Sequence, residues 1–474
     1  MATNLISNAY LNTLLKTVYD SGVYNAKYQN SPVLSAIAKE TWEGGDTFNY
    51  AVQYSNGGNF GSDYAALVNT PTSGAKNLQW AMKQGYLTGF FTINQPEILM
   101  SRSDRGSFMK FLDNEMAATF DGLSKVLATY LYGGQWGVVY KFKTGEGQTL
   151  SGTTHEFPIT SDGAIKLDIG SRFVIATAGA ADSALPSSNL LSSGVVFTVT
   201  KIGKNKITAT TAAAETGTVY DGDYIELYTA RNGSTAVGPE GLADLIPDVD
   251  GRDETPGSVW ETYIGTSFRG VDRSVAPERL AGQFADVAAN SGSSTPITDT
   301  LVDLLEATKR AGGLNNIIVV GDTTFNKIGK ELNIQRNLWQ SVNSGNEKNA
   351  FTAGYSNLAT SFGEAFINRT VIDPFCPDTE AYMFEKDDLR FMDLGNVSKV
   401  LNPVANDQLG KADISAVGDQ GIGDTPNLKL NWDKLFNIEQ GVPGTYGPAV
   451  RISANIYGNF RIRKTASAGV AKLA

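Results

Sequence analysis

Two residues and one short acidic segment of this chain have side chains that could do chemistry. His155 and Cys376 are the only histidine and the only cysteine among 474 residues. A catalytic nucleophile needs a base beside it, and zinc sites draw several ligands from histidine and cysteine. A single residue of each type excludes such a zinc site and an intrachain disulfide. We expect His155, in the turn GTTHEFP, to be exposed, and Cys376, between two prolines, to be a buried small hydrophobe.

The acidic segment is DVDGRDETPGSVWE, residues 248–261. Asp248, Asp250 and Asp253 place hard oxygen ligands beside a glycine, as calcium-binding loops do. Their spacing departs from the EF-hand pattern, so they are weak candidates for a metal site, and a solvated turn is the expected structure. The neighbouring carboxylates Asp387 and Asp388 should point apart in a turn.

No other signature of catalysis occurs in the sequence. The chain has neither the P-loop pattern nor a dinucleotide-binding glycine pattern that follows a strand and opens a helix. We therefore assign no catalytic residue, no cofactor and no metal beyond the weak aspartate set. The sequence indicates a protein that is not an enzyme.

Charge and composition limit the partners. The formal net charge is −10, which disfavours a tight grip on nucleic acid. The first twenty residues lack the features of a signal peptide, and no apolar run approaches the roughly 18 residues of a membrane helix. We expect a protein made in a cytoplasm, without a membrane partner, in which 50 glycines favour turns and β-structure.

The first hundred residues contain little that could form a core. Residues 4–20 are weakly amphipathic, and Pro32 fits the first turn of a short helix. Residues 44–95 form a glycine-rich β-excursion with YSNGGNFGSDY at 54–64. Asparagine and glycine suit a hairpin turn, but this excursion is far longer than a hairpin needs. Its aromatic residues therefore need another surface to bury them.

The most secure element is a helix from Asp104 to Tyr132. Its apolar residues recur every three or four positions, and Gly133–Gly134 end it. At 1.5 Å per residue it would be about 40 Å long.

Two further regions follow this helix. Residues 137–235 alternate apolar and polar residues between turn residues, which predicts a separate all-β barrel or sandwich. From 236 onward the pattern is α/β, with helices at 297–313 and 322–340, a buried strand at 315–321, two strands within 379–395 and a final strand at 449–465.

This order of segments resembles the HK97-fold major capsid protein of tailed bacteriophages. The resemblance rests on the arm entry NSPVLSAIAKETWEGGDTFNY, the helix FLDNEMAATFDGLSKVLATYLYGG, SFRGVDRSVAPERLAG, LVDLLEATKRAGGLNNIIVVGDTTFNKI and VIDPFCPDTEAYMFEKDDLRFMDLG. It implies an α+β fold made of an N-terminal arm (1–43), an extended β-loop (44–95), a peripheral domain with the spine helix (96–136 and 236–296), an inserted all-β domain (137–235), an axial α/β domain (297–445) and a C-terminal strand returning to the peripheral domain (446–474).

The resemblance also implies a function and partners. The chain would self-assemble as hexamers and pentamers into an icosahedral virion head around double-stranded DNA, built in the host bacterial cytoplasm with portal and scaffolding proteins and candidate decoration proteins. The extended loop would lie across a neighbouring subunit. Aromatic residues carry much of the energy of interfaces. The expected inter-subunit contacts are therefore Tyr54, Phe60, Tyr64 and Trp80.

Some features of the family do not carry over. Residues 46–75 contain no lysine, so the lysine–asparagine crosslink of some members is not expected and assembly should be non-covalent. The arm begins almost at Met1, which favours a separate scaffolding protein over a long fused scaffold. The basic residues Arg461, Arg463 and Lys464 should pair with acidic neighbouring subunits in preference to facing DNA.

Three other functions remain open from the sequence. An encapsulin-like nanocompartment shell would share the fold and enclose a cargo enzyme. A β-rich adhesin or glycan-binding protein would use residues 137–235. A cation-dependent hydrolase would need Asp248, Asp250 and Asp253 as ligands.

Overall fold

The computed structural model describes residues 31–42, 47–58, 60–64, 67, 74–94, 111–177, 190–203, 205–232, 235–247, 268–287, 297–313, 316–339, 367–393, 429–431 and 449–473. The chain divides into two compact units. One contains residues 1–29, 89–122 and 430–454, and the other contains 30–88, 123–429 and 455–474. The first unit holds the end of strand β4 (Gly85–Asn94), the first half of helix α5 (Phe111–Gly133) and the start of strand β21 (Ala449–Ile462).

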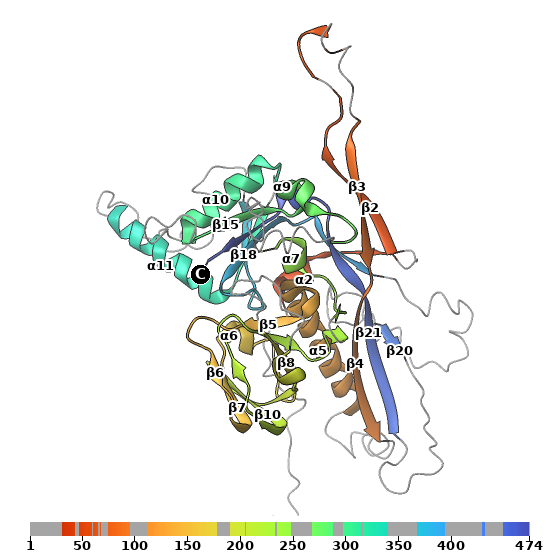
Figure 1. Cartoon of the computed structure of the whole chain (residues 1–474), viewed down its shortest axis with the longest axis vertical. Helices are drawn as coiled ribbons and strands as arrows, with labels where there is room; N and C mark the ends of the chain where they lie inside the picture. Colours follow the sequence, from red (N-terminus) through yellow and green to blue (C-terminus); the bar gives the residue numbers. More distant parts are fainter. Residues whose placement is uncertain are drawn as a thin grey trace, which may run out of the picture. The chain divides into compact units, whose positions relative to one another are not determined.

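The glycine-rich excursion at 44–95 begins as an antiparallel ribbon of two strands. Strand β2 (Thr47–Ser55) pairs with β3 (Lys76–Lys83) from Thr47 opposite Lys83 to Ser55 opposite Lys76, with a bulge at Tyr54. Figure 1 shows the two strands running side by side as one extended arm. The predicted hairpin-like excursion is therefore present as an arm, which is followed directly by β4 (Gly85–Asn94).

The arm leaves from a mixed sheet in the order β1-β19-β21-β20, with β4 also paired to β21. The short helix α2 (Pro32–Ala36) begins at Pro32 as predicted, and Ser31 caps it by accepting a hydrogen bond from the amide of Leu34. It leads into β1 (Ala38–Thr41), which runs parallel to β19 (Leu389–Asp393). Strand β21 (Ala449–Ile462) is antiparallel to β19, and β20 is Lys429–Asn431.

Helix α5 (Phe111–Gly133) confirms the predicted long helix over the described residues, and its expected first turns lie outside them. Its second half buries Leu123, Leu127, Tyr130 and Leu131. The helix ends in a short 3₁₀ turn (Gly134–Trp136) because Gly134 has φ +63° and the buried carboxylate of Asp244 occupies the place of a side chain there. That carboxylate accepts hydrogen bonds from the amides of Gln135 and Gly241, and burial raises its pKa to about 6.

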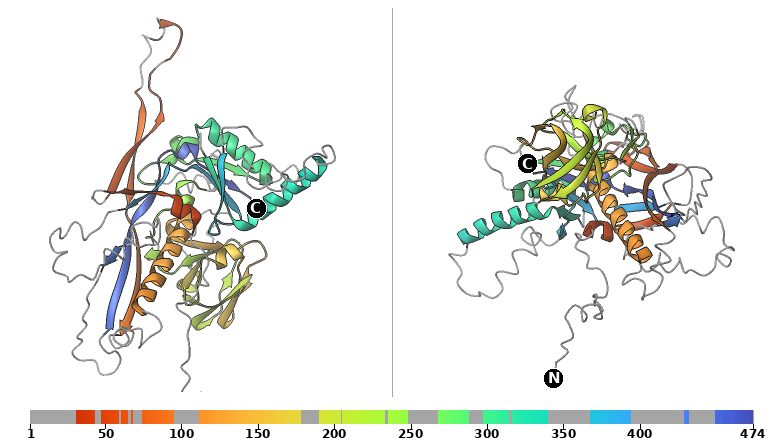
Figure 2. Two further views of the ribbon diagram at one scale, coloured as in Figure 1. Left: turned by 180° about the vertical axis from the view of Figure 1, so that it is seen from behind. Right: turned by 90° about the horizontal axis from the view of Figure 1, so that it is seen from below.

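Residues 138–236 are rich in strands, as the alternation predicts. Six strands form one sheet in the order β5-β12-β8-β9-β10-β7, with the pairs β11-β6 and β13-β14 beside it. Figure 2 shows this sheet as strongly curved. Its core cluster is built from residues between Val139 and Ile225. The elements are β5 (Val138–Lys141), β6 (Gln148–Thr149), β7 (Gly152–Pro158), α6 (Ser161–Ala164), β8 (Arg172–Ala176), a 3₁₀ turn (Leu191–Ser193), β9 (Phe197–Ile202), β10 (Lys206–Glu215), β11 (Thr218–Val219), β12 (Tyr224–Leu227), β13 (Arg231–Asn232) and β14 (Thr235–Ala236).

The α/β region forms a mixed five-stranded sheet in the order β15-β22-β18-β16-β17. Helices α10 (Ile297–Arg310) and α11 (Asp322–Trp339) cover one face, since Leu304 and Ile328 share a core cluster with Ile318, Met383 and Ala471. The strands are β15 (Gln283–Asp286), β16 (Asn316–Val320), β17 (Ile367–Ile372), β18 (Glu380–Glu385) and β22 (Gly469–Lys472). The remaining short elements are α7 (Leu242–Leu245), α9 (Pro277–Leu280) and 3₁₀ turns at Arg273–Val275 and Thr465–Ser467.

Strand β21 confirms the predicted final strand at 449–465, and a further strand that was not predicted follows it. The chain forms β21, turns at 465–467 and adds β22 between β15 and β18. Strands from the expected segments 236–296, 297–445 and 446–474 thus share one sheet. Strand β22 completes this sheet by hydrogen bonds on both of its edges, while β21 lies in the sheet with β1, β19 and β4. The expected domain boundaries, 296/297 and the return of 446–474 to a peripheral domain included, stay predictions.

Candidate functional site

The arm carries the two aromatic side chains with the highest exposed fraction among the described residues. Phe60 is 82% exposed and Tyr64 is 81% exposed, both at the tip beyond the paired strands. Gly58, with φ +97°, allows the chain to turn there and lies against the Phe60 ring. Apolar rings of this size are costly to leave in water, so the tip is a candidate contact surface.

The base of the arm is buried in its own chain. Trp80 has no exposed surface and packs with Val271 and Leu280. Its ring meets Phe268 edge-on at 5.7 Å and Tyr50 at 5.9 Å. The expected inter-subunit contact at Trp80 therefore has no surface left for a neighbour, because the loop at 268–280 already covers it.

A buried polar network joins the arm base to strand β21. Arg269 donates to Glu240 at 2.7 Å, to the phenol of Tyr50 at 2.8 Å and to the carbonyl of Phe460 at 2.7 Å. Asn459 donates to the carbonyl of Lys83 at 3.0 Å and accepts from the amide of Glu240 at 2.8 Å. Arg269 has φ +52°, which is uncommon for a residue other than glycine, so these contacts hold a strained backbone in place.

A charge cluster lies beside this network. The carboxylate of Glu40 on β1 is shared by Arg390, Arg461 at 3.3 Å and Arg463 at 3.0 Å. The guanidinium of Arg461 also lies 5.4 Å from the ring centres of Phe48 and Tyr50. Burial lowers the pKa of Arg461 in spite of Glu40. Two of the three basic residues expected to pair with a neighbouring subunit thus pair within the chain.

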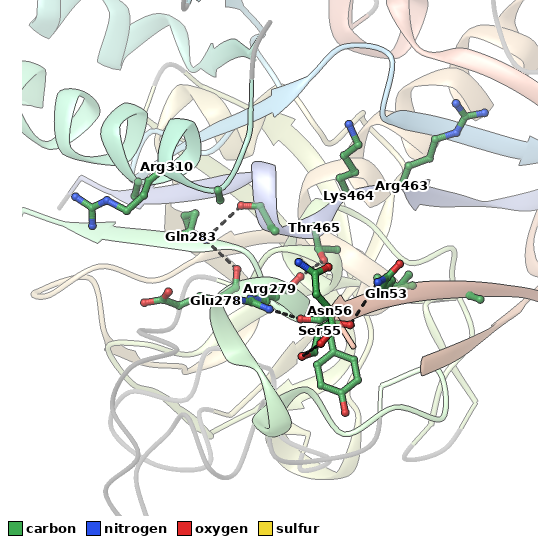
Figure 3. A pocket seen from close by; sticks show the side chains of 16 residues that line it. Gln53, Ser55, Asn56, Glu278, Arg279, Gln283, Arg310, Arg463, Lys464 and Thr465 are labelled. Atoms are coloured by element: carbon green, nitrogen blue, oxygen red, sulfur yellow. Dashed lines mark hydrogen bonds between the residues drawn. The ribbon is translucent and has the colours of Figure 1, made fainter. Parts of the chain in front are cut away.

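A hollow of about 750 Å³ opens next to the arm base. Its walls are the 51–56 stretch of β2, helix α9, the end of α10 and the turn at 463–466. Figure 3 shows the side chains that line it. Tyr54 is half-buried, and its carbonyl accepts a hydrogen bond from Arg279. Of the four expected contact residues, the structure thus places Phe60 and Tyr64 at the tip and Tyr54 and Trp80 near the base, so it does not gather them in one site.

The two residues singled out for chemistry are both buried. Cys376 is a buried small hydrophobe as predicted, and burial raises the pKa of its thiol. The expectation of an exposed His155 is wrong. It lies on β7, is 4% exposed, and meets the ring of Phe197 at 5.7 Å, because pairing with β10 turns its side chain toward the core.

The acidic candidates give no site. Asp248, Asp250 and Asp253 lie outside the described residues. Among the residues that the structure does describe, no group of three histidine, cysteine or carboxylate side chains is placed to hold a metal ion. Asp388 is buried while Asp387 is exposed, so the pair does point apart. No helix in the described part of the chain is long and apolar enough to cross a membrane.

Sequence reasoning missed Glu40, Glu240, Arg269, Arg390 and Asn459. Partners in these networks lie up to 423 positions apart, so no spacing rule could have joined them. The signal available in the sequence was the placement of Arg461 and Arg463 at alternate positions of one predicted strand, which puts both on the same face.

Comparisons with known proteins identify the fold. The chain is similar to one in the Cyanophage A-1(L) capsid asymmetric unit, with a TM-score of 0.53, 12% identity and 99% of each chain covered. Weaker likenesses include the capsid of a native GTA particle, with a TM-score of 0.45, 10% identity and full coverage of both chains, and Mycobacterium phage Ogopogo, with a TM-score of 0.43, 10% identity and 99% and 100% covered. No family model matches the chain, and no curated protein does. The likeness to the cyanophage chain confirms, for the fold, the resemblance to phage capsid proteins.

Proposed function

We propose that this chain, which has the fold of a phage capsid chain, is the major capsid protein of a tailed bacteriophage. It would assemble as hexamers and pentamers into an icosahedral head that encloses double-stranded DNA, in the virion and after assembly in the bacterial cytoplasm. One observation carries the proposal: the base of the arm is buried in its own chain, while the aromatic side chains of Phe60 and Tyr64 at its tip are exposed.

The energetics of the tip favour a second copy as its partner. Fully burying one large aromatic side chain contributes about 1.5 to 3 kcal/mol. Phe60 and Tyr64 are more than four-fifths exposed in the single chain, so nearly all of that free energy is still available. Repeated at every contact of a closed shell, it supports assembly without a covalent crosslink.

The anchored base gives the arm a fixed direction. Trp80 in its pocket and Arg269 in its network hold both strands where they leave the body. A subunit that must reach the same place on each neighbour benefits from such an anchor, since less conformational freedom is lost on assembly.

The proposal also assigns a role to residues 137–235 and names the partners of the chain. Residues 137–235 would be an insertion that decorates the outer surface or braces neighbouring capsomers. Portal and scaffolding proteins, with decoration proteins as further candidates, would be partners, and the net charge of −10 fits weak contact with packaged DNA. We assign no enzymatic activity, cofactor or metal.

Electron microscopy of the expressed protein tests the proposal. We expect shells or capsomers from the native chain and a folded but unassembled subunit from Phe60→Ser/Tyr64→Ser. The control is Val275→Ser/Ile372→Ser, which removes two exposed apolar side chains, 56% and 39% exposed, outside both the arm and residues 137–235. Equal assembly of the tip variant and the native chain would refute the role of the tip, and a monomer under all conditions would refute the capsid assignment.

A further inference from the structure

The hollow at the arm base has an unpaired strand edge as one wall. The amide of Ala81 on β3 donates away from the ribbon to the carbonyl of Arg269 at 2.9 Å, so Ala81 and its partner Asn49 form a pair without mutual hydrogen bonds. Pairs alternate along an antiparallel ribbon, so the backbone groups of Ala51 and Gln53 also point away from β3. Both residues line the hollow.

That edge is available to another strand. Among the described residues, no other segment forms a backbone hydrogen bond with Ala51 or Gln53. The side chain of Arg279 donates to the carbonyl of the next residue, Tyr54, and leaves the backbone groups of Ala51 and Gln53 uncontacted by hydrogen bonds that the described residues make. An open edge of this kind is a template for strand addition.

The remaining walls are positively charged. Arg279, Arg310, Arg463 and Lys464 line the hollow with one carboxylate, Glu278, and all five are exposed. Arg310 bonds Glu306, Arg463 shares Glu40 with two other arginines, and the buried carboxylate of Asp388 interacts with Arg463 and Lys464. The six cations of these groups outnumber their four carboxylates, which leaves a positive surplus. In a chain of net charge −10 this surplus is a local exception.

The arrangement of these cations indicates the shape of the ligand. Figure 3 shows Arg310, Lys464, Arg463 and Arg279 spread around the hollow, and their charged ends do not converge on one point. A single phosphate would contact at most one or two of them. Carboxylates that follow one another along an extended chain could contact several.

We propose that this hollow receives an extended, carboxylate-rich segment of a partner polypeptide, which adds as a strand to the outer edge of β2. The backbone of Ala51 and Gln53 pairs with the segment, and the four cations contact its carboxylates. The wall from Ala51 to Asn56 fits about six residues at roughly 3.3 Å per residue. The proposal stands independently of the capsid assignment, since it rests on this edge and these charges alone.

Binding of a fluorescein-labelled oligoglutamate to the purified full-length chain tests the charges. Such a peptide is extended by self-repulsion. We expect a rise in fluorescence anisotropy that weakens with added salt. Arg310→Gln/Lys464→Gln should weaken binding about fivefold or more, because two exposed ion pairs are lost. The control Lys201→Gln/Lys330→Gln removes two exposed lysines elsewhere and should stay within about twofold of the native chain.

Substitutions at Gln53 test whether the ligand pairs with the edge of β2. Gln53→Pro removes an amide that points outward, and an edge strand tolerates proline there. It should weaken oligoglutamate binding about tenfold. Gln53→Ala keeps the amide and should bind as the native chain does. If Gln53→Pro fails to fold, hydrogen exchange in the native chain decides instead, with slower exchange of the Ala51 and Gln53 amides expected when oligoglutamate is added.

Three results would overturn the proposal. Equal binding of oligoglutamine would show that charge plays no part. A DNA duplex that binds more tightly than oligoglutamate and is insensitive to Gln53→Pro would assign the hollow to nucleic acid. A failure of oligoglutamate to bind at low salt would show that the hollow does not receive a carboxylate-rich segment.

Discussion

The guanidinium of Arg269 lies 2.8 Å from the phenol oxygen of Tyr50 and ties a strained turn to the base of the arm. Burial raises the pKa of Tyr50 although Arg269 opposes the shift, so the phenol keeps its proton and the contact is a hydrogen bond to a neutral oxygen. Arg269 also neutralises Glu240, whose side chain is 16% exposed.

Removal of the Arg269 guanidinium should strongly destabilise the folded chain. Arg269→Gln leaves Glu240 without its ionic partner and should lower the free energy of unfolding by about 3 to 5 kcal/mol. Urea denaturation followed by fluorescence measures the loss. Arg310→Gln, at an exposed arginine, should change it by less than about 0.5 kcal/mol. A loss at Arg269 no larger than that at Arg310 would show that the network does not hold the arm.

The second prediction concerns the buried indole N–H of Trp80 and its effect on stability. Its indole nitrogen is buried and makes no hydrogen bond with the described residues. Trp80→Ala should cost about 3 to 5 kcal/mol through lost burial and a cavity. Trp80→Phe should cost much less, because it keeps most of the apolar volume and removes the buried N–H that lacks a partner. Thermal unfolding of both variants tests this order, and equal losses would contradict it.

The Glu40 cluster should respond to salt. Glu40→Gln removes the carboxylate that Arg390, Arg461 and Arg463 share and should cost about 1 to 3 kcal/mol at low ionic strength. Added salt screens the repulsion, so the deficit should shrink as ionic strength rises. Glu306→Gln, which breaks an exposed pair with Arg310, should cost less than about 0.5 kcal/mol. A deficit at Glu40→Gln that is independent of salt would argue against charge crowding.

Asp378 should make stability depend on pH. Burial raises its pKa to about 6, with a further contribution from the charge of Asp162, while Thr323 and Lys143 oppose the shift and Asp322 adds to it. An unfolded aspartate has a pKa of about 3.9. The folded state therefore holds the proton more tightly, and the stability from Asp378 is complete below about pH 4 and is lost as the pH rises through about 6.

Asp378→Asn should remove that loss. We expect the variant to be more stable than the native chain above about pH 6 and to differ little near pH 4. Chemical denaturation across this range measures the difference, with Asp387→Asn as an exposed control. A variant that is less stable at neutral pH than the native chain would contradict the assignment.

The sequence by itself determined the local elements of this protein. The three-to-four repeat before Gly133 defined helix α5, and period-two alternation defined the strands between 137 and 235. The glycine-rich stretch at 54–64 contains the tip of the arm, where Phe60 and Tyr64 are exposed. These features could be read because they depend on neighbours within a few residues along the chain.

The tertiary structure decided which distant residues meet. Trp80 and Phe60 belong to one glycine-rich excursion, yet one is buried and the other is not, because only the base of the arm lies against the loop at 268–280. Glu40 meets arginines from β19 and β21, and β22 lies between β15 and β18. No periodicity encodes such contacts, since burial and charge pairing are set by the packing of segments hundreds of residues apart.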